Sequence, residues 1–406
     1  MLVRDPIVLN QPKKADDEMR LLLLGHFPLD PDRCVIGPEY ITVCLVRGLM
    51  KIKGVELTIC SLTKGINESR IGTFENEVPV YHIPQRRGKW KISILEETYV
   101  LWSWIKRRKS EFDIINALGA FNFALPAVLS RIPTIYTVHG VESHRISLVR
   151  HSKPGKALLY SSIEKYVLGR IRGVIATETA GYTRRAVERL SDVEVREIPN
   201  PLSYADWNVV NKPVDGRILC VGTVWELKNQ KMLISAMPAL ISRFPYLKLV
   251  LAGDISSDYA RECLRLVEQM KLQSEVIFLG ICDKQIVRKE LSLADIFVLP
   301  SVYEVAPQSI AEAMAAGIPV VATDVGGVAG LVKDGETGFL INSSDENSLI
   351  QKVISVIGNR TLRHEFSQNA IRISREIFDP LNIALQTTEF IREITRPEYI
   401  RKSQRA

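Results

Sequence analysis

Short apolar runs alternate with longer amphipathic segments along most of the 406-residue chain. The run Met19–Gly25 (MRLLLLG) is apolar almost throughout and ends in a glycine, which is typical of a strand buried on both faces of a parallel sheet. A helical pattern follows at about Pro38–Lys53. Later strand-like runs read VELTICSL, DIINAL, TIYTVHG and GVIATE, and then RILCVGTV, YLKLVLAG, EVIFLG, DIFVLP and IPVVATD. Strands that alternate with helix-length segments predict an α/β protein with doubly wound parallel sheets.

The alternation is interrupted by IPNP at 198–201 and by a polar stretch that reaches Gly216. A chain of this length suggests two or three domains, at about 100–200 residues each. We therefore expect one Rossmann-like domain at 1–205 and a second at 206–380, followed by a C-terminal helix and basic tail at 381–406. Ligands of such sheets bind at the carboxyl ends of the strands, so functional residues are expected directly after strands.

The composition is that of a globular protein, with 46% hydrophobic and 24% charged residues. No apolar run approaches the roughly 18–20 residues needed to span a bilayer, and the polar N-terminus does not resemble a signal peptide. The six cysteines are scattered and form no C-x-x-C pair. This pattern favours reduced thiols in a cytoplasmic protein and argues against a zinc site.

The net charge of +7 lies entirely in the first half, where residues 1–205 hold 30 Lys and Arg against 22 Asp and Glu. Basic residues crowd segments 84–109 and 143–172, and the first of these also holds Trp90, Trp102 and Trp104. Basic residues beside Trp, Tyr and Leu suit a surface of anionic lipid head groups. The alternative is a solvated basic face whose tryptophans lie in the core. The sequence contains no recognised nucleic-acid-binding module.

Two glutamates, Glu304 and Glu312, flank a predicted strand-to-helix junction in PSVYEVAPQSIAEAMAAG. Pro307 suits the first helical turn, and the free N–H groups of Gln308 and Ser309 would form an anion site at the helix N-terminus. Glu304, in the preceding loop, can accept hydrogen bonds from hydroxyls, and Glu312 can accept two from a vicinal diol such as ribose. A phosphate between two polyols describes a sugar nucleotide. Taken singly, each acid has the alternative role of an ordinary solvated residue.

The E-x7-E block resembles that of the retaining family 4 glycosyltransferases of the GT-B fold, also called glycosyl transferases group 1, which include relatives of glycogen synthase and bacterial mannosyltransferases. The resemblance covers most of the chain and extends to GTVWELKNQ, LVLAGD, VIFLG, GIPVVATDVGGVAGLVKDGETGFLI, TVHG and IPNP. It implies two Rossmann-like domains that face each other across a cleft, the first binding the acceptor and the second the donor. It also implies transfer of a hexosyl group from a nucleotide diphosphate sugar to a hydroxyl of a glycan or lipid-linked acceptor, with retention and without a cofactor or metal.

The resemblance also assigns roles around the E-x7-E block. It implies that Glu304 contacts the donor sugar and Glu312 the ribose. It implies that the backbone of Ala306, Gln308 and Ser309 holds sugar hydroxyls and phosphate.

Further donor-binding roles fall on residues outside that block. Lys228 lies in a loop after a strand, where an ammonium can neutralise the leaving diphosphate. Gly222 precedes Thr223, which stands where the family usually has an arginine. Gly37 corresponds to a family glycine that lets the backbone approach the diphosphate. The ordinary alternatives are a solvated loop lysine and turn glycines.

Two residues of the first half are expected near the acceptor. His139 ends the strand TIYTVH, and the resemblance implies that it contacts the donor sugar from the opposite domain. Asn116 lies in IINALG, where members often carry a further histidine. A structural role is the ordinary alternative for a lone histidine.

Two other functions remain open at this point. Thr223 and Asn116 favour a catalytically weakened GT-B protein that binds sugar nucleotides, and a GT-B phosphorylase or epimerase shares the two facing domains. Among these we favour a cytoplasmic glycosyltransferase, peripheral at the inner face of the membrane.

Overall fold

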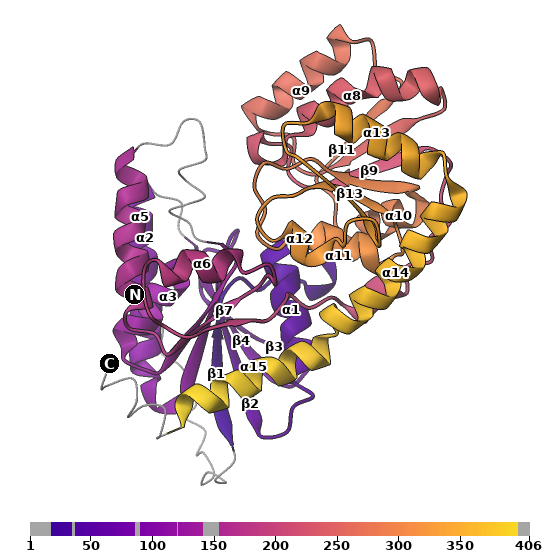
Figure 1. Cartoon of the computed structure of the whole chain (residues 1–406). Coiled ribbons are helices and arrows are strands. Elements are labelled where there is room, and N and C mark those ends of the chain that lie inside the picture. The colour runs from indigo at the N-terminus through magenta and orange to yellow at the C-terminus, as the bar shows by residue number, and fades with distance from the viewer. Residues whose placement is uncertain (1–17, 35–36, 86–89, 120, 141–153, 397–406) are drawn as a thin grey trace.

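The computed structural model describes residues 18–34, 37–85, 90–119, 121–140 and 154–396. These residues form two α/β halves, seen in Figure 1 as an indigo-to-magenta half and a pink-to-orange half. The expected basic tail at 397–406 lies outside the described residues.

The first half is built on an eight-stranded sheet of order β3-β4-β2-β1-β5-β6-β7-β8. All neighbouring strands pair in parallel except β3 with β4. The strands are β1 Met19–Leu24, β2 Val55–Thr63, β3 Arg70–Phe74, β4 Val78–Pro84, β5 Ile114–Gly119, β6 Thr134–Val138, β7 Gly173–Ala176 and β8 Val195–Glu197.

The second half is built on a six-stranded parallel sheet of order β11-β10-β9-β12-β13-β14. Its strands are β9 Arg217–Val221, β10 Lys248–Ala252, β11 Val276–Gly280, β12 Ile296–Leu299, β13 Val320–Thr323 and β14 Gly338–Ile341. The strand order reverses between β9 and β12, and ligands of open α/β sheets bind at such a switch point.

Helices connect the strands and cover the sheets. Those of the first half and the linker are α1 Gly37–Leu49, α2 Trp90–Arg107, α3 Phe121–Ser130, α5 Pro154–Leu168, α6 Tyr182–Glu188 and α7 Tyr204–Trp207. Those of the second half are α8 Gln230–Arg243, α9 Asp258–Gln269, α10 Lys284–Leu293, α11 Gln308–Ala315, α12 Val328–Leu331, α13 Glu346–Ile357 and α14 Arg360–Phe378. The last helix is α15 Pro380–Thr395.

Helix α15 returns from the second half and packs on α1 of the first half (Figure 1). Gly48 on α1 permits this approach, because a Cβ there would lie 2.2 Å from the carbonyl oxygen of Pro380. Gly173 on β7 similarly leaves room for the ring of Phe390. One apolar cluster therefore runs through both halves, with members such as Leu23 in β1, Val46 in α1, Leu219 in β9 and Ile391 in α15.

The structure confirms the predicted fold class of two parallel-sheet α/β units. Each strand-like run named in the sequence corresponds to a strand, and most of these strands are buried along most of their length, as strands covered on both faces are. Four strands were not predicted: β3, β4, β8 and β14. In the part of the chain that the structure describes, no helix is both long and apolar enough to cross a membrane.

All six cysteines are free thiols, and five of them are buried. Burial raises the pKa of Cys34 to about 11 and that of Cys44 to about 12. Both thiols are therefore protonated at neutral pH and are poor nucleophiles.

Candidate active site

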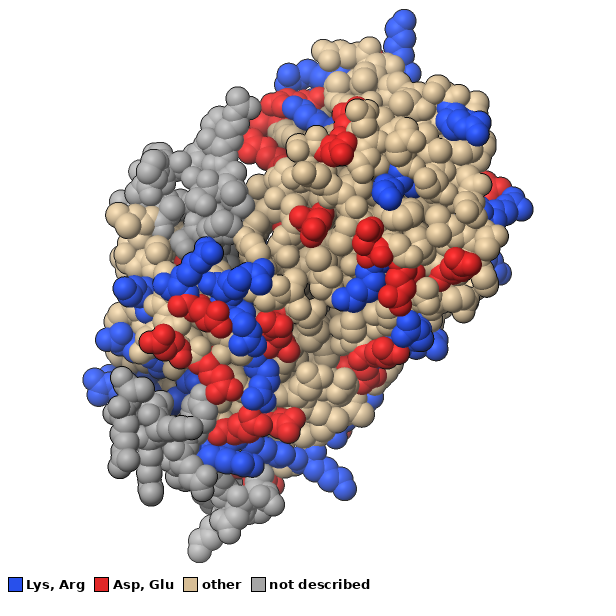
Figure 2. All heavy atoms as spheres, viewed as in Figure 1, with Lys and Arg blue, Asp and Glu red and all other residues tan. Residues whose placement is uncertain are grey.

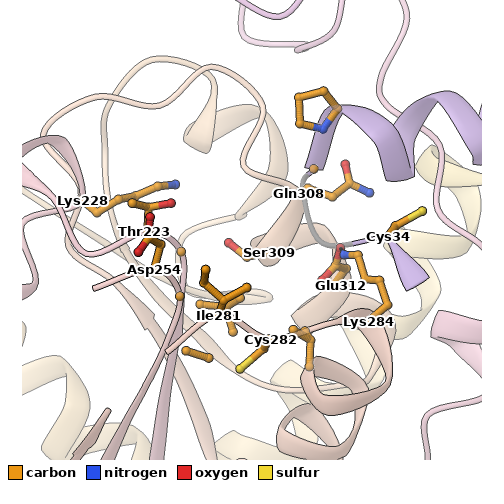
Figure 3. A pocket seen from close by; sticks show the side chains of 17 residues that line it. Cys34, Thr223, Lys228, Asp254, Ile281, Cys282, Lys284, Gln308, Ser309 and Glu312 are labelled. Atoms are coloured by element: carbon orange, nitrogen blue, oxygen red, sulfur yellow. Dashed lines mark hydrogen bonds and ion pairs between the residues drawn. The ribbon is translucent and has the colours of Figure 1, made fainter. Parts of the chain in front are cut away.

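A cavity of about 490 Å³ lies between the two halves, at the carboxyl ends of β9 and β10. The first half contributes its lining at the start of α1, and the second half contributes the rest. The lining residues are Cys34, Gly37, Pro38, Val221, Gly222, Thr223, Lys228, Ala252, Gly253, Asp254, Ile281, Cys282, Lys284, Val287, Gln308, Ser309 and Glu312. Figure 3 shows Lys228, Thr223 and Asp254 at one end of the cavity, and Lys284 with Glu312 at the other.

The glycines after β9 and β10 shape the first end of the cavity. A Cβ at Gly253 would lie 2.1 Å from the carbonyl oxygen of Gly222, so the two turns can be this close only without a side chain there. A Cβ at Gly222 would lie 3.2 Å from Cε of Lys228. Gly222 therefore leaves the space along which the Lys228 side chain runs.

Lys228 and Glu304, both expected at the site, are in direct contact. The ammonium of Lys228 donates a hydrogen bond of 2.6 Å to Oε1 of Glu304, which also accepts one of 2.6 Å from the Ser301 hydroxyl. The exposed fractions of the Lys228 and Glu304 side chains are 19% and 9%. Lys228 lines the cavity and Glu304 does not, so the bond to the carboxylate uses one N–H of the ammonium and fixes the position of a cation at the cavity wall.

A glycine pair after β13 supports the Glu304 loop. Gly326 has φ +56°, in the left-handed region, and a Cβ there would lie 1.7 Å from the carbonyl oxygen of Glu304. A Cβ at Gly327 would lie 1.9 Å from the carbonyl oxygen of Val305 and 2.7 Å from Cβ of Glu178 in the first half. The glycine pair therefore lets three chain segments meet behind the site.

Helix α11 begins beside the cavity, as the sequence predicts. Pro307 lies at the N-cap rather than in the first turn, and Gln308 and Ser309 line the cavity. The Gln308 side chain donates a hydrogen bond of 3.2 Å to the carbonyl oxygen of Pro201 in the linker. The first N–H groups of α11 have no partner within the helix, so the dipole and these donors favour an anion here.

Glu312 lies deeper in the cavity and forms an ion pair with Lys284 on α10. Burial raises the pKa of the Glu312 carboxyl, and the nearby ammonium of Lys284 acts in the opposite direction. The Lys284 ammonium also lies 4.0 Å from the ring centroid of Tyr40 on α1.

The remaining predicted site residues differ in where they lie relative to the cavity. Gly37 lines the cavity at the start of α1, and a Cβ there would meet no atom within 4 Å. Ala306 is half-buried in the Glu304 loop but does not line the cavity. Asn116 lies in the middle of β5, fully buried, and accepts a hydrogen bond of 2.8 Å from Thr137. Its amide nitrogen is buried without a hydrogen-bond partner among the described residues, and its role near the acceptor stays a prediction.

His139 follows β6 and lies outside the cavity lining. The adjacent Gly140 faces the second half, since a Cβ there would lie 3.1 Å from Cγ2 of Val305 and 3.5 Å from the hydroxyl of Tyr303. His139 therefore lies next to a residue, Gly140, that contacts the loop carrying Glu304. Burial, and to a smaller extent His26, lowers the pKa of His139 to about 4, so its imidazole is neutral at pH 7.

Sequence reasoning missed Lys284, Asp254 and Cys34, which all line the cavity. Asp254 and Cys34 both come after predicted strands, so the rule that ligands bind at strand ends could have identified them as candidates. Lys284 offers no local signal, because its partner Glu312 is 28 residues away along the chain and comes close only in the folded protein.

Comparisons with known proteins agree with this geometry. The family model of Glycosyltransferase Family 4 matches residues 35–204, and that of Glycosyl transferases group 1 matches residues 208–373. Together the two models cover most of both halves. The chain belongs to the family 4 glycosyltransferases. The boundary between the two matches falls in the linker that contains α7.

Solved structures with low sequence identity share the two-domain GT-B fold of the chain. Sucrose-phosphate synthase from Thermosynechococcus elongatus superposes with a TM-score of 0.78 at 20% identity, covering 93% of this chain and 99% of that one. HepE from Anabaena, in complex with UDP and glucose, superposes with a TM-score of 0.71 at 20% identity, covering 93% of this chain and 100% of that one.

Among curated relatives, the uncharacterized glycosyltransferase MJ1607 of Methanocaldococcus jannaschii is 34% identical over 170 residues. That match covers 42% of this chain and 43% of the relative. The chain thus spans about two fifths of the length of the first curated relatives it matches.

Proposed function

We propose that this family 4 protein is a retaining glycosyltransferase, which moves a hexosyl group from a nucleotide diphosphate sugar to a hydroxyl acceptor. One observation carries the proposal: a single cavity between the halves holds a cation, a helix N-terminus and a buried carboxylate. Lys228 and the N–H groups of Gln308 and Ser309 suit a diphosphate, and Glu312 suits the ribose diol. The UDP and glucose bound to the related HepE support the same assignment.

The chemistry follows from where negative charge develops. When the bond between the sugar and the diphosphate breaks, charge accumulates on the leaving phosphate, and a fixed ammonium stabilises it more than water does. Lys228 is held in this position by Glu304, and its ammonium has three N–H donors, so it can bind a phosphate oxygen while still bonded to Glu304. In the mechanism implied for this family, the leaving phosphate itself takes the proton of the acceptor hydroxyl. No metal and no carboxylate nucleophile is part of the proposal.

Thr223 favours a second candidate, a protein that binds sugar nucleotides with weakened catalysis. Thr223 lines the cavity where the family usually has an arginine, so one cation is absent from the diphosphate end. Steady donor turnover separates the enzyme from the binding protein.

The acceptor is proposed to lie at a membrane surface, because α2 exposes an apolar and aromatic stripe. Leu95 and Tyr99 have exposed fractions of 71% and 65%. Trp102 continues this stripe one turn later, and the Lys106 ammonium lies 4.8 Å from its ring centroid. A row of exposed apolar and aromatic side chains with a lysine at its end suits a lipid interface. Trp104, in contrast, is buried in the core of the first half, as the alternative expected.

The proposed lipid contact is local rather than spread over the whole first half. On the face seen in Figure 2, basic and acidic side chains of that half are interleaved, so this face is not a surface of one sign. The side chain of Trp90 and residues 86–89 lie outside what the structure describes.

The function is tested first by thermal shift with UDP, GDP and ADP sugars. A ligand at 100 times its Kd stabilises the protein by about 2.7 kcal/mol, so the true donor class stands out. The stabilising donor is then incubated with acceptors, and release of nucleotide diphosphate is measured. No stabilisation by any of these nucleotide sugars contradicts the proposal.

A further inference from the structure

Glu312, which the proposed function assigns to the donor's ribose, is held by a cation that this assignment does not include. Its carboxylate forms an ion pair with Lys284, and both residues line the cavity. The exposed fractions of the Glu312 and Lys284 side chains are 3% and 13%. A pair this well buried differs from a surface pair, because removing one partner leaves an uncompensated charge in a poorly solvated place.

Lys284 is itself anchored from the opposite half. Its ammonium lies 4.0 Å from the ring centroid of Tyr40, within the range of a cation–π interaction. The Tyr40 hydroxyl donates a hydrogen bond to Asp206 and accepts one of 2.9 Å from the backbone N–H of Ser203. The Lys284 ammonium is therefore fixed between α1 of the first half and α11 of the second.

The other charged groups near Glu312 do not replace Lys284. Asp206 on α7 repels the Glu312 carboxylate, and Arg288 on α10 is bonded to Asp206 through Nε at 2.8 Å. On α1, the thiol of Cys44 is neutral at physiological pH, because burial raises its pKa to about 12. Lys284 therefore makes the direct contact that offsets the burial of the Glu312 carboxylate.

The pair leaves Glu312 able to bind a diol. A carboxylate has about four lone-pair sites, and the hydrogen bond from the Lys284 ammonium is accepted by Oε1 of Glu312. The remaining sites can accept two hydrogen bonds from vicinal hydroxyls. Figure 3 shows Glu312 and Lys284 together on the side of the cavity nearest Cys34.

We propose that Lys284 is a positioning residue for the donor's ribose, which keeps the Glu312 carboxylate ionised and oriented to accept the 2′ and 3′ hydroxyls. The proposal rests on the proposed function, because it takes the bound ligand to be a nucleotide with a free diol. It also means that the ribose subsite is complete only when both halves contribute, since Tyr40 supports Lys284 from the first half.

The test measures nucleotide binding by calorimetry between pH 6 and pH 8.5. UDP, GDP and ADP are titrated first, and the nucleotide that binds most tightly is used together with its 2′,3′-dideoxy analogue. In Lys284→Met, binding is expected to weaken about tenfold or more at pH 7, the scale of one charge-assisted hydrogen bond. Binding by this variant should weaken further as the pH falls, because the unpaired Glu312 carboxyl takes up a proton. Binding by the wild type should change little over this range.

Three controls separate positioning from a general structural role. Lys284→Arg keeps the cation and should restore both the affinity and the flat pH profile. The double variant Lys284→Met, Glu312→Gln has no carboxyl to titrate, so its weak binding should not depend on pH. The dideoxy analogue should bind the wild type and Lys284→Met with similar affinity. Circular dichroism and thermal unfolding verify that each variant is folded.

The anchor on Tyr40 is tested by a matched pair of variants. Tyr40→Phe keeps the ring beside the ammonium and loses only the hydroxyl, whereas Tyr40→Leu loses both. Tyr40→Leu alone should acquire the pH dependence of Lys284→Met. The proposal is overturned if Lys284→Met has the pH profile of the wild type, or if it loses affinity for the dideoxy analogue to the same extent. If the wild type binds none of the three nucleotides, the proposed function fails and this inference fails with it.

Discussion

Lys228 and Glu304 are bonded to each other at 2.6 Å, and only the lysine reaches the cavity. A carboxylate behind an ammonium fixes the direction of its remaining N–H donors. The two residues therefore form one functional unit, in which Glu304 orients the charge that Lys228 presents. Ser301 completes this unit by donating a hydrogen bond to the same carboxylate oxygen.

Lys228→Ala is expected to lower the transfer rate about 100-fold or more, the usual scale for losing one preorganised electrostatic group. The reason is that Thr223, at the same end of the cavity, carries no charge. The measurement is kcat with saturating donor, with and without magnesium, which should not rescue the variant. Lys228→Arg, which retains the positive charge, should lower kcat less than Lys228→Ala does. A strict requirement of the wild type for a divalent metal would contradict this mechanism.

Glu304→Gln should abolish most transfer and leave the fold intact. Glutamine has the shape of glutamate and its amide oxygen can still accept the hydrogen bonds of Ser301 and Lys228, so the expected loss comes from the missing negative charge beside the donor sugar, which the proposed role of Glu304 requires. Glu312→Ala is the comparison, because it should mainly raise the Kd of the donor. Turnover by Glu304→Gln near the wild-type rate would show that the assignment is wrong.

Gly326→Ala should destabilise the protein and lower its activity, whereas Gly335→Ala should affect activity little. Both glycines have positive φ, at +56° and +74°, so each alanine adds about 1–2 kcal/mol of left-handed strain. Only at Gly326 would the new Cβ also collide with a carbonyl oxygen, that of Glu304 at 1.7 Å. Chemical denaturation and kcat measure the two effects. Equal losses of activity would mean that the Glu304 loop does not depend on this contact.

The continuous apolar runs predicted the strands well, because a strand buried on both faces must be apolar throughout. Two of the strands that were missed, β3 and β8, lack this property, whereas β14 (GFLI) is apolar but has only four residues. In β3 (RIGTF) four of the five residues are exposed, and β8 (VRE) has three residues, two of them charged. Glu304, Lys228 and Glu312 could be predicted as site residues because the motifs that contain them are local in the sequence. Lys284 and the core position of Asn116 depend on packing between distant segments, which no local pattern reports.

The stability of the protein should fall as the pH drops from about 6.5 toward 4, and His139 should account for part of this fall. The pKa of His139 is lowered to about 4 in the folded protein, so in this window the unfolded chain binds more protons than the folded one. At pH 5 the expected loss is about 2 kcal/mol relative to pH 7.5. His139→Gln should lack this contribution in denaturation curves at the two pH values. Identical losses for both proteins would refute it.

Binding to anionic vesicles at low salt is expected if α2 meets a membrane. The double variant Leu95→Ser, Tyr99→Ser removes the exposed apolar residues and should weaken co-sedimentation. Replacing Lys106 and Arg107, at the end of α2, with Ser should weaken it by about 1 kcal/mol per charge and reduce its dependence on salt. Donor binding should be unchanged in each case.

The matched control replaces Arg261 and Arg265, exposed on α9 of the second half, with Ser. This change removes the same charge from the other half and should leave vesicle binding as it is. Arg86 and Arg87, also predicted to contribute, lie outside the described residues and can be replaced in a further variant. If the wild type does not bind anionic vesicles at low salt, the proposed membrane contact is wrong and the acceptor is expected to be a soluble molecule.

The return of α15 to the first half has a consequence for how the chain is made. The first sheet ends at Glu197, yet Phe390 of α15 fills a space beside its strand β7. A ribosome adds about 5–20 residues per second, so the first half emerges about 10–40 s before the helix that covers it. During that interval the surface of α1 and β7 that α15 covers lacks this helix. Removal of α15 would therefore expose residues of α1 and β7 in the first half, far from α15 along the chain.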